Sequence, residues 1–576
     1  MNQYAELAKQ KWSIAQQLPW MKLVHLFTLR MFRGGDSDSN EIGATVGAIL
    51  VLLAMPGVLV SLLLLDEYGS LVRFLQGKGA FDPFVAPIPD EYFFIVLSMA
   101  VCGAILIWRW DALFPDQRDY QNLVHLPIPI GRIFLANLTS IVVFTVTVIV
   151  VINIASAILF PVAVLGSEGT AQDFFQFAFG HAVTMFATSF FAALAVFAVL
   201  GTLLSILPYR AFRPVSLVVK FFLALVFLVL LATSGTVPAI LDRKDYAGSL
   251  VDFFPSVWML GLAQTLWHRH SSLFISEMSW RAARVSAVLF LLSAATYWLG
   301  FRKSFLRIPE IAERGLISSR QSHAGFIFTR IGAMGASNAV RACNRFVIQT
   351  LFRSASHVQL MLTAVALSLI AVAKLTDNVY AAHTAAQMTA ARNALFSIPF
   401  IVGFLFAASL RVAFEIPVDI RANWTFRFWL DPTKQESRSI ARRIMYMLCL
   451  PWLLPLTAIY AIWLWGWIDG LLHLLFSGTC MLLLIEVLIL KYRKVPFTCA
   501  FPTYKSRSPL VLALYVLGFV FFGSYLPALE ASALAERWDM LWFVPVLGAI
   551  YVGLRTFRKE MLQMDKLVIF EEGDGI

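Results

Sequence analysis

Charged residues are scarce in this chain of 576 residues. Asp, Glu, Lys and Arg together make up 14% of it, whereas hydrophobic residues make up 59% and the mean hydropathy is +0.74. This composition excludes a string of soluble domains and is typical of a membrane protein with many spans. The net charge of +11 comes from basic residues in short loops between apolar runs. That distribution indicates membrane topology and argues against nucleic-acid binding.

Recognisable ligand-binding motifs are absent as well. The five cysteines include no pair at the spacing of zinc ligands, so we expect neither a disulfide nor a metal site. No Gly-x-x-x-x-Gly-Lys-Ser/Thr phosphate-binding loop occurs, because Gly77, Lys78 and Gly79 have neither its spacing nor its hydroxyl group. The first 40 residues mix basic residues with short apolar pieces, which predicts no cleavable signal peptide and a cytosolic N-terminus.

Apolar runs of about 20 residues, the length that crosses a bilayer core, are what the chain has in abundance. They predict an all-α membrane protein of about twelve transmembrane helices in two parallel six-helix repeats. The expected parts, in order, are an interfacial N-terminal helix (1–42), a first six-span domain (43–301), a basic cytosolic linker with an interfacial helix (302–355), a second six-span domain (356–556) and a cytosolic tail (557–576).

The individual spans are expected at about 43–65, 92–108, 133–160, 178–206, 215–234 and 284–300, then two in 356–413, and at 444–466, 470–490, 510–527 and 540–556. Cytosolic segments of this arrangement carry 35 Lys and Arg residues and outer segments carry 10. This asymmetry places both termini in the cytosol. A shorter apolar segment, 257–263, is framed by Trp258 and Trp267, which predicts an interfacial or re-entrant element.

Helical spacing near the N-terminus predicts an amphipathic helix at the inner membrane face, with one apolar side formed by Leu18, Met21, Val24, Leu26, Leu29 and Phe32.

A charged, proline-bounded stretch, 109–132, separates the second and third spans. Asp116, Arg118 and Asp119 follow Pro115, which suits the start of a short helix whose dipole favours acidic residues. We expect this helix to lie across the cytosolic membrane surface, with Leu123 and Val124 against the bundle. An ordinary solvated loop is the alternative.

A similar pattern follows the eighth span. Arg411 precedes Pro417 by the same number of residues that separates Arg109 from Pro115. The segment after it, 419–431, would place Ile420, Trp424 and Phe428 on one helical face. The chain therefore contains two candidate cytosolic helices at corresponding positions of its halves.

The order of these elements resembles the permease subunit of type-two ABC exporters, with two such subunits fused in one chain. The phrases at 112–120 (ALFPDQRDY), 420–427 (IRANWTFR) and 494–499 (KVPFTC) are similar to those of a bacterial branch of these permeases. The resemblance implies coupling helices at 113–124 and 418–430 that dock into two ATP-binding subunits. It assigns the contact to Asp116, Arg118, Asp119, Tyr120, Leu123 and Val124 in the first helix, and to Ile420, Arg421, Trp424, Arg427 and Phe428 in the second.

By the same resemblance, the chain would be no enzyme itself and would bind no cofactor, since ATP and Mg would be held by two copies of a partner ATPase. It would lie in the bacterial cytoplasmic membrane, in contact with membrane lipid, and export a hydrophobic or amphiphilic substrate such as a lipid, a peptide or a drug.

Two other functions fit the topology. A secondary carrier with twelve spans usually needs ionisable residues within the membrane, and Glu486 is the clear candidate, with a structural hydrogen bond as its other interpretation. A lipid-linked glycosyltransferase would place acidic residues on the first outer loop, where Asp66 and Glu67 occur. Two adjacent carboxylates at a helix end are more often solvated interface residues, so catalysis is the less favoured interpretation.

Overall fold

The computed structural model describes residues 19–32, 54–68, 84–113, 128–165, 170–238, 250–267, 273–314, 338–380, 384–416, 440–450, 466–490, 495–497, 508–535 and 537–564, with a few single positions between them. All regular elements in these ranges are helical, and no strand occurs among them. Eight of the described helices are long and apolar enough to cross a membrane. The chain is therefore an all-helical, multi-pass membrane protein.

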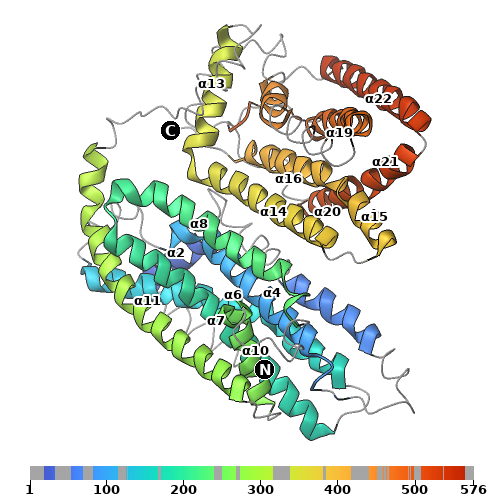
Figure 1. Ribbon diagram of the computed structural model, residues 1–576. Helices are drawn as coiled ribbons and strands as arrows, with labels where there is room; N and C mark the ends of the chain where they lie inside the picture. The colour runs from blue at the N-terminus through green and yellow to red at the C-terminus, as the bar shows by residue number, and fades with distance from the viewer. Residues whose placement is uncertain are drawn as a thin grey trace, which may run out of the picture. The chain divides into compact units, whose positions relative to one another are not determined.

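The chain divides into two compact units, Met1–Ser318 and Ser319–Ile576, and the division falls inside the predicted linker. Unit 1 contains α2 (Pro19–Phe32), an unlabelled helix at 54–68, α4 (Ile88–Trp108), the short η1 (Trp110–Ala112), α6 (Ile130–Leu165), α7 (Ala171–Ile206), α8 (Tyr209–Ala232), η2 (Leu250–Phe253), α10 (Pro255–Leu266) and α11 (Leu273–Arg314) (Figure 1).

Local sequence explains where the central helices of unit 1 begin. Helix α4 starts with Pro89 in its first turn and has Asp90 and Glu91 beside it, which suits the positive end of the helix dipole. Helix α7 starts with a capping box, in which Thr170 and Asp173 satisfy each other's backbone N–H groups. Both helices thus begin with proline or polar residues that stabilise the first turn of a helix.

Close packing between the helices of unit 1 depends on small residues. A Cβ atom at Gly103 of α4 would lie 2.3 Å from the ring of Phe227 in α8, and one at Gly201 of α7 would lie 2.3 Å from the hydroxyl of Thr296 in α11. Within a membrane, such small residues allow backbones to approach and increase van der Waals contact. The pairings also show that α4, α7 and α11 run in one direction, whereas α6 and α8 run in the other.

One detail of unit 1 differs from the predictions. Leu23, Phe27 and Met31 form the buried face of α2, whereas Leu26, expected on that face, is 60% exposed. The helix packs against α6, and this tertiary contact selects the buried face. The predicted interfacial or re-entrant element at 257–263 lies in α10, whose 12 residues are too few to cross a bilayer, and the flanking Trp267 is only 1% exposed and stacks on Phe177 with the ring centroids 4.7 Å apart. Helix α10 is thus a short helix packed inside the unit.

Unit 2 contains α13 (Asn338–Arg353), α14 (Ala355–Tyr380), α15 (Ala385–Ala394), α16 (Ser397–Ala413), a helical stretch at 440–450, α19 (Trp467–Leu488), α20 (Ser508–Val520), the π-helical turn η5 (Phe521–Tyr525), α21 (Leu526–Ala535) and α22 (Arg537–Met564) (Figure 1). Side-chain contacts show that α16, α19 and α22 run in one direction. Helices α14 and α20 and the 440–450 stretch run in the other.

The eight candidate spans are Ile88–Trp108, Ile130–Leu165, Ala171–Ile206, Val215–Ala232, Ser276–Phe301, His357–Thr376, Trp467–Leu488 and Ala513–Leu534. They coincide with eight of the twelve predicted ones. Of the other four, α16 is apolar but has 17 residues, and α22 is long but does not meet the same criteria. The structure describes part of the first predicted span within the 54–68 helix, and part of the ninth chiefly within the 440–450 stretch.

Candidate functional site

The backbone that leaves α4 is fixed by the N-terminal helix. Arg30 of α2 donates a hydrogen bond from Nη2 to the carbonyl oxygen of Ala112 at 2.7 Å, and Arg109 donates from Nη2 to the carbonyl oxygen of Phe32 at 3.3 Å. Burial lowers the pKa of the Arg109 guanidinium from its ordinary value. The two arginines thus join α2 to η1 in both directions. Arg30 of α2 bonds the last residue of η1, and Arg109 bonds the last residue of α2.

Two more helices, α6 and α8, hold η1 and the residue after it. Asn137 of α6 donates from Nδ2 to the carbonyl oxygen of Leu113 at 3.1 Å and to the Tyr297 hydroxyl of α11 at 2.6 Å. Lys220 of α8 forms an ion pair with Asp111, with 2.8 Å between Nζ and Oδ2. Because Lys220 comes from a span and is almost fully buried, this pair explains how an amine is tolerated there.

The first predicted coupling helix starts directly after this anchored backbone. Of its residues, the structure describes Leu123, which is 9% exposed and belongs to the hydrophobic core of unit 1. Asp116, Arg118, Asp119, Tyr120 and Val124 lie outside the described residues. Their helical conformation and their contact with a partner stay predictions.

The backbone that leaves α16 in unit 2 is anchored too, by different residues. His357 of α14 donates from Nε2 to the carbonyl oxygen of Ile416 at 3.2 Å, and the backbone N–H of Phe497 donates to the carbonyl oxygen of Phe414, also at 3.2 Å. Arg411 donates from Nε to the carbonyl oxygen of Leu488 at 3.0 Å and forms an ion pair with Glu415. The second predicted coupling helix, with Ile420, Arg421, Trp424, Arg427 and Phe428, lies outside the described residues.

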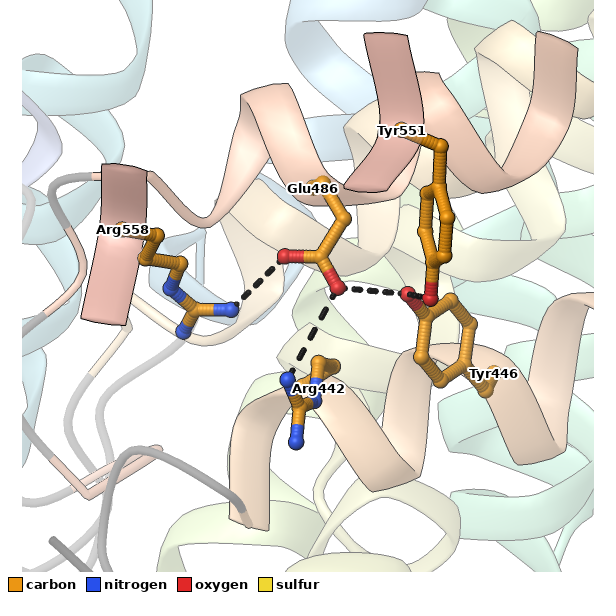
Figure 2. Close-up of polar contacts among 5 residues, drawn as sticks. All are labelled: Arg442, Tyr446, Glu486, Tyr551 and Arg558. Atoms are coloured by element: carbon orange, nitrogen blue, oxygen red, sulfur yellow. Dashed lines mark hydrogen bonds and ion pairs between the residues drawn. The ribbon is translucent and has the colours of Figure 1, made fainter. Parts of the chain in front are cut away.

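Glu486, the predicted intramembrane polar residue, is fully buried near the end of α19 and joins three helical segments of unit 2 (Figure 2). Its Oε2 atom accepts a hydrogen bond from Nη1 of Arg558 at 2.9 Å. Its Oε1 atom accepts one from the Tyr446 hydroxyl at 2.6 Å and lies 3.8 Å from Nη1 of Arg442. The Tyr446 and Tyr551 hydroxyl groups are 3.2 Å apart.

The charges of this cluster are unequal, because two guanidinium groups approach one carboxylate. Arg558 is 5% exposed at its side chain and makes the direct bond, whereas Arg442 is 26% exposed and more distant. Burial lowers the pKa of Arg558, and the Glu486 carboxylate acts in the opposite direction. All the described contacts of Glu486 are to its own unit. The arrangement therefore ties the ends of α19, α22 and the 440–450 segment together.

A second kind of buried charge was missed by the sequence analysis. Glu91 of α4 and His181 of α7 are both 0% exposed, and their Oε2 and Nδ1 atoms are 2.6 Å apart. In unit 2, His473 of α19 and Glu530 of α21 form a pair of the same kind, 2.7 Å apart and likewise 0% exposed. The predicted spans 92–108 and 510–527 stop just short of the two glutamates. A histidine early in an apolar run, with a glutamate at the edge of another, was the available indication.

Asp66 and Glu67, the candidate catalytic acids of the glycosyltransferase interpretation, are exposed near the end of the 54–68 helix. Their exposure fits solvated residues at a helix end. Comparisons with protein-family models, with curated proteins and with solved structures find no match.

Proposed function

We propose that this chain is the membrane-spanning permease subunit of an ATP-driven ABC transporter, built from two fused six-span repeats. Hydrolysis of ATP with Mg would take place on a separate ATPase subunit, present in two copies. The substrate class we propose is hydrophobic or amphiphilic, the transport direction is outward, and the site of action is the bacterial cytoplasmic membrane with both termini in the cytosol.

The observation that carries this proposal is the anchoring of the segment that follows the second predicted span of each unit, α4 in unit 1 and α16 in unit 2. A force applied to the tip of such a segment can reach the bundle only if the base of the segment is rigidly held. In unit 1, α2, α6 and α8 each hold η1 or the residue after it. In unit 2, α14 and the 495–497 segment hold residues 414–416.

The order and direction of the helices support the repeat. Each unit begins with a helix that precedes the first span, α2 or α13, and continues through two antiparallel helices to the anchored backbone. In each unit the next helix is α6 or the 440–450 stretch, and it is followed by the helix that carries the buried histidine, α7 or α19. Each ends with a short helix, α10 or α21, and a long one, α11 or α22. The absence of a phosphate-binding loop from the sequence supports a separate ATPase.

The decisive experiment is purification of the chain from its native host in a mild detergent. We expect an ATPase subunit to co-purify in two copies per permease, and the permease alone to show no ATP hydrolysis. Asp119→Arg should reduce co-purification, because an unpaired charge within a contact costs about 2–5 kcal/mol when its partner is left buried.

The matched control is Glu277→Arg, a charge reversal at an exposed carboxylate of α11. This variant should retain the ATPase, because Glu277 lies outside the proposed contact. Loss of the ATPase from both variants, or from neither, would contradict the assignment of the docking segment.

A secondary ion-coupled carrier is the second candidate, and the two buried Glu–His pairs favour it. Ionisable side chains within membrane spans mark ion or proton pathways in many transporters. The experiment that separates the two candidates uses the purified chain alone in liposomes with an imposed pH gradient. Substrate movement without ATP would support the carrier and exclude dependence on an ATPase.

A further inference from the structure

The Glu91–His181 pair lies in surroundings that exclude water. Three aromatic rings approach the imidazole, with centroid distances of 5.0 Å for Phe160, 5.7 Å for Phe94 and 6.4 Å for Phe177. The ring of Trp267 stacks in turn on the ring of Phe177. The pair therefore has a nonpolar cover around its two polar groups, and its net charge is set by the protons that it holds.

Three protonation states of the pair are chemically distinct. With one proton between them, the carboxylate and imidazole are together neutral, whether the proton resides on oxygen or on nitrogen. With none the pair carries a charge of −1, and with two it carries +1. A net charge without a partner is unfavourable in a dry protein interior, so the closed structure selects the state with one proton.

Unused hydrogen-bonding capacity remains beside the pair. Oε1 of Glu91 and Nε2 of His181 have no hydrogen-bond partner among the described residues, and both are fully buried. The hydroxyl groups of Thr184 and Thr188, one and two turns further along α7, are also buried without a partner. Polar atoms in this situation are normally satisfied by water or by an alternative arrangement.

A polar row continues from these threonines towards the middle of the bundle. Ser98 donates to Oδ1 of Asn153 at 2.7 Å, and Asn153 donates from Nδ2 to the Ser189 hydroxyl at 2.8 Å. A small cavity adjoins this network and is lined partly by Ser98, Asn153 and Ser156. The interface between α4, α6 and α7 can thus accept water if these helices separate at the end that holds the pair.

Unit 2 supplies an independent second case. His473 lies early in α19, the helix that occupies the place of α7 in the order of elements, and Phe396 and Phe400 approach its ring with centroids 5.2 Å and 6.4 Å away. Its partner Glu530 comes from α21, and Oε2 of Glu530 is buried without a partner among the described residues. The glutamates come from different helices, yet each unit buries one Glu–His pair under aromatic rings.

We propose that Glu91–His181 and His473–Glu530 are two occluded proton-binding sites, one in each unit, and that uptake of a second proton opens the helices that cover each pair. The second proton makes the pair positively charged, and entry of water between the helices relieves that charge. The proposal holds whichever energy source drives transport, because it concerns contacts within each unit.

Other charged groups at the same end of unit 1 could also respond to pH, so the test must separate them. On the elements around the pair and in the turn before α4 they are Asp66, Glu67, Tyr68, Asp82, Asp90, Tyr92, Asp173, Asp252, Glu277, Arg281 and Arg284, while α10 and the adjoining ends of α6 and α8 carry none. Among the described residues, Glu91 and His181 form an ion pair only with each other.

The experiment is hydrogen–deuterium exchange of the full chain in lipid nanodiscs at about pH 5.5 and about pH 8, the range over which histidine commonly changes charge. After correction for the intrinsic rate, we expect peptides from the starts of α4 and α7 to exchange about threefold faster or more at the lower pH. The double variant Glu91→Gln with His181→Gln keeps a neutral hydrogen-bonded pair, and it should remove this response in unit 1 only.

In unit 2 we expect peptides from α19 and α21 to exchange faster at the lower pH in the same way. The double variant His473→Gln with Glu530→Gln should remove that response and leave the response of α4 and α7 intact, which gives an independent test if the first variant does not fold. Glu277→Gln, an exposed carboxylate on α11, serves as the control and should behave as wild type. A wild-type protein without a pH response, a response that survives in its own double variant, or a response lost in the control would each overturn the proposal.

Discussion

Replacement of Arg558 by Gln tests whether the Glu486 cluster ties unit 2 together. Removal of one partner from a buried ion pair costs about 3–5 kcal/mol, because it leaves an uncompensated charge. Here Tyr446 and the more distant Arg442 still approach the carboxylate, so the loss should fall near the lower limit, about 3 kcal/mol. For a unit of this size, that loss corresponds to a fall of about 6–12 °C in the unfolding midpoint.

The matched variant is Arg442→Gln, which also removes one arginine from the cluster. Its side chain is 26% exposed and 3.8 Å from the carboxylate, so its loss should cost less than about 1 kcal/mol. Glu486→Gln combined with Arg558→Gln should be more stable than Arg558→Gln alone, because no unpaired buried charge remains. This pattern distinguishes a charge effect from a general packing defect.

A thiol-reactive dye can report unfolding of unit 2 selectively. Cys102 is the only cysteine of unit 1, so a Cys102→Ala background leaves reporters in unit 2 alone, among them the buried Cys343, Cys449 and Cys480. All variants would be compared in this background by the temperature at which the dye reacts. Equal losses in Arg558→Gln and Arg442→Gln, or no loss in either, would refute the assignment of Arg558 as the principal partner.

Three further predictions concern packing, coupling and topology. Gly103→Ala should destabilise unit 1 by about 1–3 kcal/mol in thermal unfolding, because its Cβ would overlap the Phe227 ring, whereas Gly131→Ala, with open space around it, should not. Leu123→Ala should loosen the first coupling segment by roughly 2 kcal/mol and uncouple ATP hydrolysis from transport in the reconstituted complex, and Trp424→Ala should do the same through the second. Cysteines placed at Tyr120 and Thr425 should be shielded from impermeant reagents outside intact cells, while one at Lys78 is labelled; labelling at either of the first two would exclude cytosolic coupling helices.

Hydropathy alone predicted most of the helices, because the requirement for about 20 apolar residues per span leaves a strong pattern in the sequence. It could not predict which face of α2 is buried. The predicted apolar side included Leu26 and left out Leu23, and because both residues are leucine, hydropathy does not distinguish them. Only the contact with α6, which covers Leu23 and leaves Leu26 exposed, decides between them.

The Glu–His pairs show a second limit of sequence analysis. A charged residue at the edge of an apolar run normally marks the end of a span, because it is stable in water and unstable in lipid. Glu91 and Glu530 were therefore placed outside their predicted spans. In the structure each meets a histidine from another helix, and the pair together carries no obligatory net charge. Such pairing depends on tertiary contacts between residues 90 and 57 positions apart, which no local pattern contains.

Glu486 was found from the sequence because it is the only Asp, Glu, Lys or Arg within the predicted span 470–490. Its partners could not be predicted, since Arg442 and Arg558 lie in segments that read as ordinary basic ends of spans. The basic residues of the predicted cytosolic segments are thus of two kinds. Exposed ones are expected to determine topology, and others, such as the 5% exposed Arg558, bind a carboxylate inside the unit.

Helix α4 connects two groups of polar contacts in unit 1. At one end is the Glu91–His181 pair, and at the other η1 and the residue after it are bonded to α2, α6 and α8. Helix α4 runs without interruption between these places, and the Ser98–Asn153–Ser189 network joins it to α6 and α7 midway. A rigid helix bonded at both ends cannot tilt at one end without straining contacts at the other. In the proposed permease, docking of an ATPase beside η1 and protonation of the distant pair would therefore act on the same helix, and each should change the free energy of the other.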